Sequence, residues 1–436
     1  MSRRITASQQ TSERIEQVIE ALEAHREGPS LTQLGLRKIV EELLEAEVSE
    51  RLGRGYYERG EDDGQGHRNG YRRGRLKTAE GEVEYSVPQV RGLEEPFRSR
   101  IRPELGVRTE ALEDLAVEMY ARGLSTRDIE AALCDGKGRS LLSRTAVSQV
   151  TERLWQEYEA FANRDLSEYE IAYLFADGIA ERLHGGQRRE AVLCAWGITV
   201  EGQKVLLHLS PGTKEDTESC RAFFQDMKRR GLRDPLFVAT DGAPGLIRAV
   251  EECFPRTERG RCLAHRMRNL QSKVPDGEWP EFREKARAAY QAPSREVARM
   301  LRDVVVAEYE TRFPSAVKCF LDDFEACIAH LRFPIAHRRV IRTTNLLERL
   351  FGEERRRMKI VANAFGERAV LKLMYAALIR ASETWRGVLV NSFELKQLEA
   401  VGAELDAEHA RRHAPIETKT KSEGVSSFRK SSKNRT

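Results

Sequence analysis

The sequence has no run of eighteen apolar residues, so we expect no membrane-spanning helix. Residues 1–6 include two arginines with no apolar segment after them, which does not resemble a secretory signal. Cysteine is scarce: seven are scattered through 436 residues without a CxxC spacing, which argues against a disulfide framework and favours a reducing cytoplasm. A strong charge imbalance is also lacking, because 73 basic and 69 acidic residues leave a net charge of +4. With 40% hydrophobic residues, we expect a folded chain of about two or three domains.

Helical spacing of apolar residues predicts helix over about residues 11–52, and residues 53–76 then break the pattern with seven glycines and six arginines. This second segment is either a flexible linker or an arm that contacts DNA, and its arginines and tyrosines favour DNA contact. Residues 77–88 alternate around a turn and predict a β-hairpin. The candidate DNA contacts of the segment are Arg68, Tyr71 and Arg72.

Two short helices are predicted further on. Ser125 is suited to cap the first, with Asp128 at the capping-box position, and the second begins after Ser143. Short helices joined by a tight connection, the second polar at its start, predict a helix-turn-helix, although an ordinary helical hairpin has the same pattern. The candidate DNA contacts here are Arg127, Arg144, Thr145, Ser148 and Gln149.

From about residue 169 the order strand-strand-strand-helix-strand-helix-strand predicts a mixed α/β sheet. Residues 264–331 have a helical pattern, helix resumes at residue 343, and the carboxyl end is basic and poor in apolar residues. We predict six parts: helices, the Gly/Arg/Tyr-rich segment and the hairpin in 1–100, the helix-turn-helix-like region in 101–165, the first part of the sheet domain in 166–263, a helical insertion in 264–335, further core helices in 336–410, and a disordered basic tail in 411–436.

Two aspartates, Asp177 and Asp241, each follow a predicted buried strand and precede a glycine. Ligands usually bind at the carboxyl ends of strands in open α/β sheets, because loops and helix N-termini converge there. If the two strands are neighbours, a divalent cation explains how both carboxylates stay ionised. For either aspartate alone, a simple Asp-Gly turn explains the sequence as well.

A third acid, Glu348, shares one face of a predicted helix with Asn345, Gly352 and Arg355. That face suits close approach of a polyanion, although a solvated helix face would have the same spacing. Residues 328–359 carry nine Lys/Arg against three acids, which favours a phosphate-bearing partner. A second basic cluster surrounds Cys262 and comprises Arg256, Arg259, Arg261, Arg266, Arg268 and Lys273.

Three carboxylates can hold two metal ions for phosphodiester chemistry, and oxygen ligands favour Mg²⁺ or Mn²⁺. With these residues in place, about residues 36–385 resemble the mutator-type bacterial insertion-sequence transposases, which carry an RNase H-like DDE domain. Six motifs in order carry the resemblance: HRNGY at 67–71 with LKT at 76–78, GLSTRDI at 123–129, FADG at 175–178, DGAPGL at 241–246, RCLAH at 261–265 with RNL at 268–270, and TTNLLE at 343–348.

The resemblance implies that Asp177, Asp241 and Glu348 are the DDE ligands of two Mg²⁺ or Mn²⁺ ions. It implies an RNase H-like mixed sheet interrupted by a helical insertion, with a mainly helical DNA-binding region before it. Cys262 and His265 match the family's Cys-x2-His element. Because a zinc site would need four ligands, we instead expect His265 near the scissile phosphate as a hydrogen-bond donor. The further residues expected at the DNA are Arg342, Asn345, Arg349 and Arg355.

The resemblance also implies a function. The protein would bind the terminal inverted repeats of a mobile element, cut the DNA strand and join it to target double-stranded DNA, as a homodimer or larger assembly in the bacterial cytoplasm, associated with the nucleoid. Two alternatives stay open. One is an RNase H-like nuclease without strand transfer, and the other is an inactive relative that regulates by binding DNA.

Overall fold

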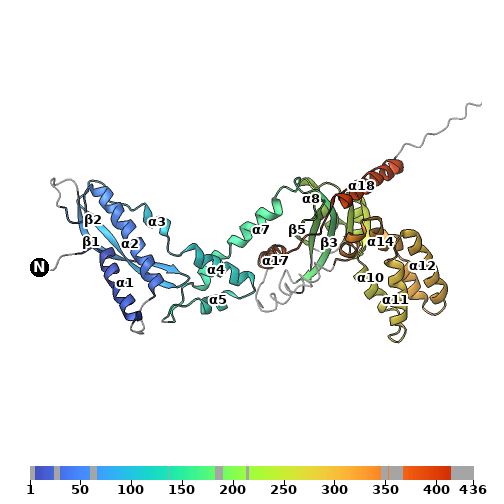
Figure 1. Cartoon of the computed structure of the whole chain (residues 1–436), viewed down its shortest axis with the longest axis horizontal. Coiled ribbons are helices and arrows are strands. Elements are labelled where there is room, and N and C mark those ends of the chain that lie inside the picture. The colour runs from blue at the N-terminus through green and yellow to red at the C-terminus, as the bar shows by residue number, and fades with distance from the viewer. Residues whose placement is uncertain are drawn as a thin grey trace, which may run out of the picture.

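The computed structural model describes residues 5–23, 30–58, 66–136, 138–181, 190–212, 216–344, 352 and 367–413. The described parts form an elongated molecule (Figure 1). A helix-and-hairpin unit lies at one end, a group of short helices follows, and a β-sheet with a helical insertion occupies the other end. No helix among these residues is both long and apolar enough to cross a membrane.

The first unit packs a β-hairpin against helices. Its elements are α1 (Ala7–Glu23), α2 (Leu31–Leu52), β1 (His67–Thr78), β2 (Gly81–Arg91) and α3 (Ile101–Leu105). Val40 and Leu44 of α2 bury against Leu76, Tyr85 and Val87 of the hairpin. The predicted hairpin is confirmed, but it is longer than expected. The prediction of an irregular arm or linker is wrong for residues 67–76, which form most of β1.

Four helices connect this unit to the sheet: α4 (Glu110–Ala121), α5 (Thr126–Ala132), α6 (Arg144–Val150) and α7 (Arg153–Asn163). The capping box at the start of α5 is confirmed, because the Ser125 hydroxyl accepts from the Asp128 N–H while the Asp128 carboxylate accepts from the Ser125 N–H. The expected tight connection between α5 and α6 is wrong. Residues 133–143 separate the two helices and include a β-bridge between Cys134 and Ser140.

The predicted order of strands and helices is confirmed in the sheet domain. Its elements are β3 (Ile171–Glu181), β4 (Glu190–Thr199), β5 (Lys204–Gly212), α8 (Thr217–Arg229), β6 (Phe237–Thr240), α9 (Pro244–Cys253) and β7 (Glu258–Arg261). The strands lie in the order β5-β4-β3-β6-β7. The pairs β3–β4 and β4–β5 are antiparallel, and the pairs β3–β6 and β6–β7 are parallel.

Both faces of this sheet are covered. On one face Leu174 and Val238 pack with α8 and α9, and on the other Phe175 and Ala239 pack with α7, α17 (Glu367–Ser382) and α18 (Ser392–His413). We call the face covered by α7, α17 and α18 the α17 face. Side chains alternate between faces along a strand, so the apolar runs of β3 and β6 supply both cores.

Residues 263–341 are helical apart from short connections, which confirms the predicted helical stretch. Its elements are α10 (Leu263–Gln271), α11 (Trp279–Tyr290), α12 (Arg295–Tyr309), α13 (Pro314–Leu321), α14 (Phe324–Ile328), the 3-10 helix η1 (Ala329–Arg332) and α15 (Ile335–Ile341). Most of this stretch has an apolar core of its own around Phe282, Tyr309 and Phe320.

Near the carboxyl end, the predicted tail began too early, because residues 411–413 complete α18. Residues 414–436 lie outside the described part of the chain. All seven cysteines are within the described part, and no disulfide joins them. The division of the chain into domains stays a prediction.

Candidate active site at the ends of strands β3, β6 and β7

The register of the sheet brings Asp177 and Asp241 together. Parallel pairing of β3 and β6 ends at Ala176 opposite Thr240, so each aspartate is the next residue along its strand. On the β4 side β3 continues, with Asp177 opposite Cys194. The expectation that β3 ends at Asp177 is therefore wrong, although it holds for the edge shared with β6. The two carboxylates lie where that parallel pairing stops.

Both aspartates also belong to the same face of the sheet. Phe175 and Ala239, two residues earlier on their strands, are part of the core on the α17 face. Because the side-chain period of a strand is two, Asp177 and Asp241 are directed to that face as well. Asp177 is only 5% exposed, whereas Asp241 is half-buried. The pair is therefore a polar end to an apolar layer.

Local hydrogen bonds orient the two carboxylates. Asp177 Oδ1 accepts from the Gly178 N–H, and Asp241 Oδ1 accepts from the Ala243 N–H, both at 2.9 Å. Gly242, which lies between Asp241 and Ala243, has φ +96°, and a Cβ there would lie 2.3 Å from Arg261 Nε. Glycine is therefore required at this turn by both backbone conformation and space. The Asp-Gly pair at 241–242 follows β6, and it presents a carboxylate where the parallel pairing with β3 stops.

Cys262, which follows β7 and precedes α10, connects three parts of the site. It is fully buried, and its Sγ accepts from the Thr344 N–H at 3.3 Å. The Thr344 hydroxyl lies 3.4 Å from both Cys262 Sγ and Asp177 Oδ2. Close by, the Leu263 N–H donates to the Arg342 carbonyl at 2.9 Å. Hydrogen bonds thus hold residues 342–344 next to Asp177.

His265, one turn into α10, interacts with the same thiol. The hydrogen bond to Cys262, helped by the negative charge of Asp177, raises the pKa of His265. Burial acts to raise the pKa of Cys262, but hydrogen bonds from His265 and Thr344 outweigh it and lower this pKa. Both shifts favour an imidazolium next to a thiolate. His265 is therefore paired with the Cys262 thiol. Its expected role as a hydrogen-bond donor to the scissile phosphate stays a prediction.

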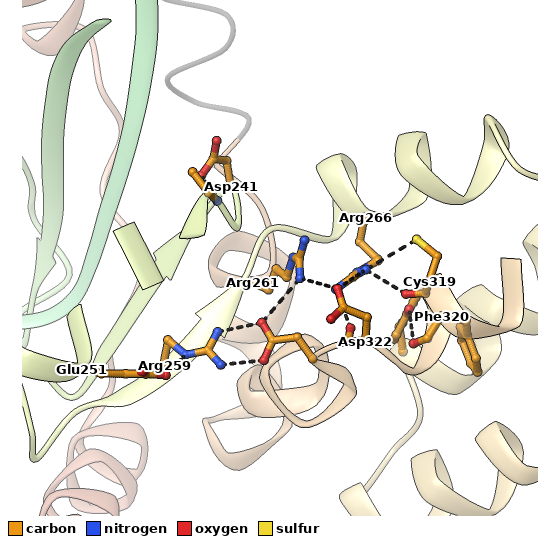
Figure 2. Close-up of polar contacts among 11 residues, drawn as sticks. Asp241, Glu251, Arg259, Arg261, Arg266, Cys319, Phe320 and Asp322 are labelled. Atoms are coloured by element: carbon orange, nitrogen blue, oxygen red, sulfur yellow. Dashed lines mark hydrogen bonds and ion pairs between the residues drawn. The ribbon is translucent and has the colours of Figure 1, made fainter. Parts of the chain in front are cut away.

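The basic cluster around Cys262 is mostly paired with acids, contrary to our expectation of unbalanced charge. Arg261 Nη1 lies 3.1 Å from Asp322 Oδ2, and the buried Arg266 donates to the same carboxylate and to the Cys319 carbonyl. Arg259 binds Asp323 with both terminal nitrogens. In Figure 2 this network joins β7 and α10 to the turn between α13 and α14, and the Asp241 carboxylate points away from it. These arginines dock the insertion onto the sheet.

Some predicted site residues cannot be placed. Glu348, Asn345, Arg349 and Arg355 lie outside the described residues, while Arg342 is half-buried in the segment fastened to α10. Among the described residues, no group of three or more His, Cys, Asp or Glu side chains could hold a metal ion. The sequence argument missed Thr344 as a site residue, although its position just before the predicted glutamate helix was a usable signal.

The family described as "Transposase, Mutator family" matches residues 6–387, which is most of the chain. The chain belongs to the Mutator family of transposases. The sequence resemblance on which the site was predicted is thus confirmed at the level of the family.

Individual relatives agree with this membership. The chain is 30% identical over 286 residues to the transposase for insertion sequence element IS6120 of Mycolicibacterium smegmatis, covering 65% of this chain and 88% of the relative. It is 29% identical over 352 residues to the ISRM5 transposase of Rhizobium meliloti, covering 80% and 87%. It is 28% identical over 354 residues to the IS256 transposase in transposon Tn4001 of Staphylococcus aureus, covering 80% and 90%.

Among solved structures, the Drosophila P element transposase strand transfer complex matches with 9% identity over 70% of this chain and 93% of that one. The TM-score of 0.27 is too low to support any argument about fold or function.

In this Mutator-family chain, the predicted contacts on α5 and α6 lie on exposed surface. Arg127 is exposed on α5, and the exposed residues of α6 are Arg144, Thr145, Ser148 and Gln149. Arg144 also forms an ion pair with Glu130 at 2.8 Å. The inward side of α6 buries Val147 and Val150 instead. The helix is therefore held by its apolar side and presents its polar side outward.

The candidates from the first unit differ from one another. Arg68 donates to the Gly55 carbonyl, the Arg54 carbonyl and the Ser49 hydroxyl, so its guanidinium is used within the protein. The Tyr71 hydroxyl accepts from the Ala7 N–H and donates to Glu45. Arg72 is exposed. DNA contact by these residues stays a prediction, and the first two have a clear structural role beside it.

Proposed function

We propose that this Mutator-family protein is a DDE transposase that cuts DNA at the ends of a mobile element and joins them to target DNA. Asp177, Asp241 and Glu348 would be the ligands of two Mg²⁺ or Mn²⁺ ions. The observation that carries the proposal is the adjacency of Asp177 and Asp241 on one face, at the end of a parallel strand pair. The strand order β5-β4-β3-β6-β7 supports an RNase H-like sheet, with a three-stranded antiparallel part extended by two parallel strands.

The donor set fits hard divalent cations. Two carboxylates that end adjacent strands repel each other, and a doubly charged ion between them removes that repulsion. Oxygen ligands at a partly hydrated site are those preferred by Mg²⁺ and Mn²⁺. Each aspartate accepts a backbone N–H with its Oδ1, and Asp177 Oδ2 also lies 3.4 Å from the Thr344 hydroxyl, so both carboxylates are held in place. Such ions would activate the attacking oxygen and stabilise the leaving oxygen.

Glu348 is within reach of this pair along the chain. Thr344 lies beside the Asp177 carboxylate, and only four residue steps separate it from Glu348. Four residues of extended chain span at most about 14 Å, and four residues of helix span about 6 Å. A glutamate side chain can cover much of the remaining distance. The fastening of residues 342–344 to Cys262 and Leu263 therefore supports the third ligand without fixing its geometry.

The protein's own groups would orient the substrate for two displacement reactions. In the first, water attacks a phosphorus atom at the element end, and the bond to the leaving 3′ oxygen breaks to give a 3′-OH. In the second, that 3′-OH attacks a target phosphodiester, and another 3′ oxygen leaves. His265, which is hydrogen-bonded to Cys262, would donate a hydrogen bond to a phosphate oxygen. Arg342 would neutralise phosphate charge, with Arg349 and Arg355 further along the chain.

DNA would be recognised by the parts that precede the sheet. The exposed side of α6 and the first unit would bind the terminal inverted repeats as double-stranded DNA. Because two element ends must be held together for joining, we propose a homodimer or larger assembly on DNA.

A strand-transfer assay with purified protein tests this proposal. Asp177→Asn, Asp241→Asn and Glu348→Gln should each reduce cutting and joining at least about 1,000-fold in Mg²⁺, while Glu201→Gln, at an exposed turn between β4 and β5, should retain both activities. Chelation with EDTA should stop cutting but spare binding. Retention of joining by any of the three site variants would refute the site. Cutting without joining of pre-cut ends would identify a nuclease, and binding alone would identify an inactive regulator.

A further inference from the structure

A groove with one sign of charge lies in the first unit, between the β1–β2 hairpin and the segment of residues 97–107. Its volume is about 650 Å³, and its lining includes four arginines but no carboxylate. Its charged and polar lining residues are Arg72, Arg75, Arg98, Arg102, Gln89 and Ser99. In a chain with nearly equal numbers of acids and bases, a basic groove without acids is unusual and indicates an anionic occupant.

The charge of this groove is not balanced from within the described protein. Arg72, Arg98 and Arg102 are exposed, and no carboxylate of a described residue lies within 4 Å of their guanidinium groups. Arg75 is partly balanced, because Glu84 lies 3.4 Å and Glu82 3.7 Å away.

A neighbouring pocket makes the contrast clear. Beside α2, three glutamates and three arginines line the same pocket, and Arg100 lies 2.9 Å from Glu50. Carboxylates thus line one side of the 97–107 segment and are absent from the lining of the other, and Arg98 borders both.

The groove is also held in shape before any ligand binds. Glu47 of α2 accepts hydrogen bonds from the Ser99 hydroxyl and the Arg100 N–H, which fixes one end of the 97–107 wall. At the other end, the Lys77 N–H donates to the Val107 carbonyl at 3.0 Å and the Thr109 N–H donates to the Lys77 carbonyl at 2.9 Å. The wall is therefore attached to both α2 and β1. A preformed groove loses less conformational entropy on binding.

We propose that this groove binds the sugar-phosphate backbone of duplex DNA. The proposal rests on the proposed function for the kind of ligand, and it adds Arg75, Arg98 and Arg102 as contacts. Guanidinium groups match phosphate oxygens with two parallel hydrogen bonds. The lining also includes Tyr85, Val87 and Val107, whose apolar atoms can pack against deoxyribose. Because phosphates are the same in every sequence, the groove would add affinity and position the DNA without reading bases.

Salt-dependent binding of the full chain to DNA in EDTA tests this inference independently of cutting. The variant pair Arg98→Gln/Arg102→Gln should make the slope of log K against log salt shallower by about 2, because each phosphate contact releases about one counterion. The loss of affinity should be the same fold for an element-end duplex and a scrambled duplex. Arg98→Lys/Arg102→Lys keeps the charge and should retain the wild-type slope. A thermal melt of each variant establishes that it is folded.

The matched control is Arg73→Gln/Arg91→Gln, which removes the same charge from exposed positions of the same hairpin outside the groove. This control should leave the slope within about 0.5 of wild type. A wild-type slope in the groove variant, an equal change in the control, or a loss confined to the element end would each overturn the proposal. If the groove variant keeps the wild-type slope, only the groove proposal fails. The proposed function is tested separately, because cutting and joining are measured in Mg²⁺ and not in EDTA.

Discussion

At the scale of single residues, Thr344 is the most informative contact of the candidate site. It is fully buried, and its hydroxyl lies 3.4 Å from both Asp177 Oδ2 and Cys262 Sγ. It is also the last described residue before the segment that contains Glu348. A hydroxyl in this position can orient the Asp177 carboxylate and also fix the point from which the segment containing Glu348 begins.

We therefore predict that Thr344→Val lowers strand cutting at least about tenfold while it lowers the free energy of unfolding by about 1–3 kcal/mol, because buried acceptors lose their donor without a change of shape. Thr344→Ser keeps the hydroxyl and should retain most of the activity. The control is Thr343→Val, since the Thr343 hydroxyl makes no hydrogen bond to a described residue. Cutting assays and denaturant unfolding measure the two effects. Equal losses of activity in Thr343→Val and Thr344→Val would contradict the positioning role.

Residue-scale prediction from sequence succeeded where the deciding interaction is local. An apolar run that stops at Asp-Gly located the end of the β3–β6 pairing, because each aspartate follows the last paired residue of its strand. It failed for Arg259, Arg261 and Arg266, because their partners Asp322 and Asp323 lie more than fifty positions away in the insertion. A count of charges within a short window cannot include such partners.

At the scale of elements, the same distinction holds. The capping box of α5 closes within four residues and was predicted correctly. Most of strand β1 was missed because Gly74 looks like a helix and strand breaker, whereas a Cβ there would lie 2.5 Å from the Tyr85 ring. The glycine makes room for a cross-strand aromatic side chain, and only the pairing of β1 with β2 reveals this need. The longer connection before α6 likewise depends on the Cys134–Ser140 bridge.

Helix α6 allows a direct test of sequence-specific binding. Ser148 and Gln149 are exposed on the polar side of the helix, so their replacement should not disturb the core formed by Val147 and Val150. We predict that Ser148→Ala/Gln149→Ala weakens binding to an element-end duplex about 10- to 100-fold, because each lost base contact costs about 1–3 kcal/mol. Binding to a scrambled duplex should change less than threefold, and the melting temperature should be unaltered within about 2 °C.

The matched control for α6 is Gln156→Ala, which removes an exposed polar side chain from the next helix, α7. It should bind both duplexes as the unaltered protein does. Equal weakening of element-end and scrambled binding by the α6 variant would instead assign α6 to backbone contact, and unchanged binding to both duplexes would mean that these side chains make no contact.

At the scale of the whole molecule, α17 unites two cores that lie apart in the sequence. Its Met374 and Tyr375 pack in the core on the α17 face of the sheet, whereas Leu373 and Ala376 pack with α4, α5 and α6. In Figure 1 the helix lies between the short helices and the sheet. The DNA-binding candidates and the carboxylate pair are thus joined through one element, although the molecule is elongated.

Leu373→Ala tests whether this shared helix couples the two cores. Leu373 is 3% exposed, and its truncation should cost about 2–5 kcal/mol through lost packing and a residual cavity. Because α17 belongs to both cores, amide hydrogen exchange should accelerate about 30-fold or more in α6 and in β6 alike. The control is Leu142→Ala, a fully buried residue of the same core that lies in the connection before α6 and not in α17. It should accelerate exchange in α4–α6 and leave β6 unchanged. Acceleration confined to α4–α6 in the Leu373 variant would mean that the short helices and the sheet unfold independently, and that DNA binding is not coupled to the active site through α17.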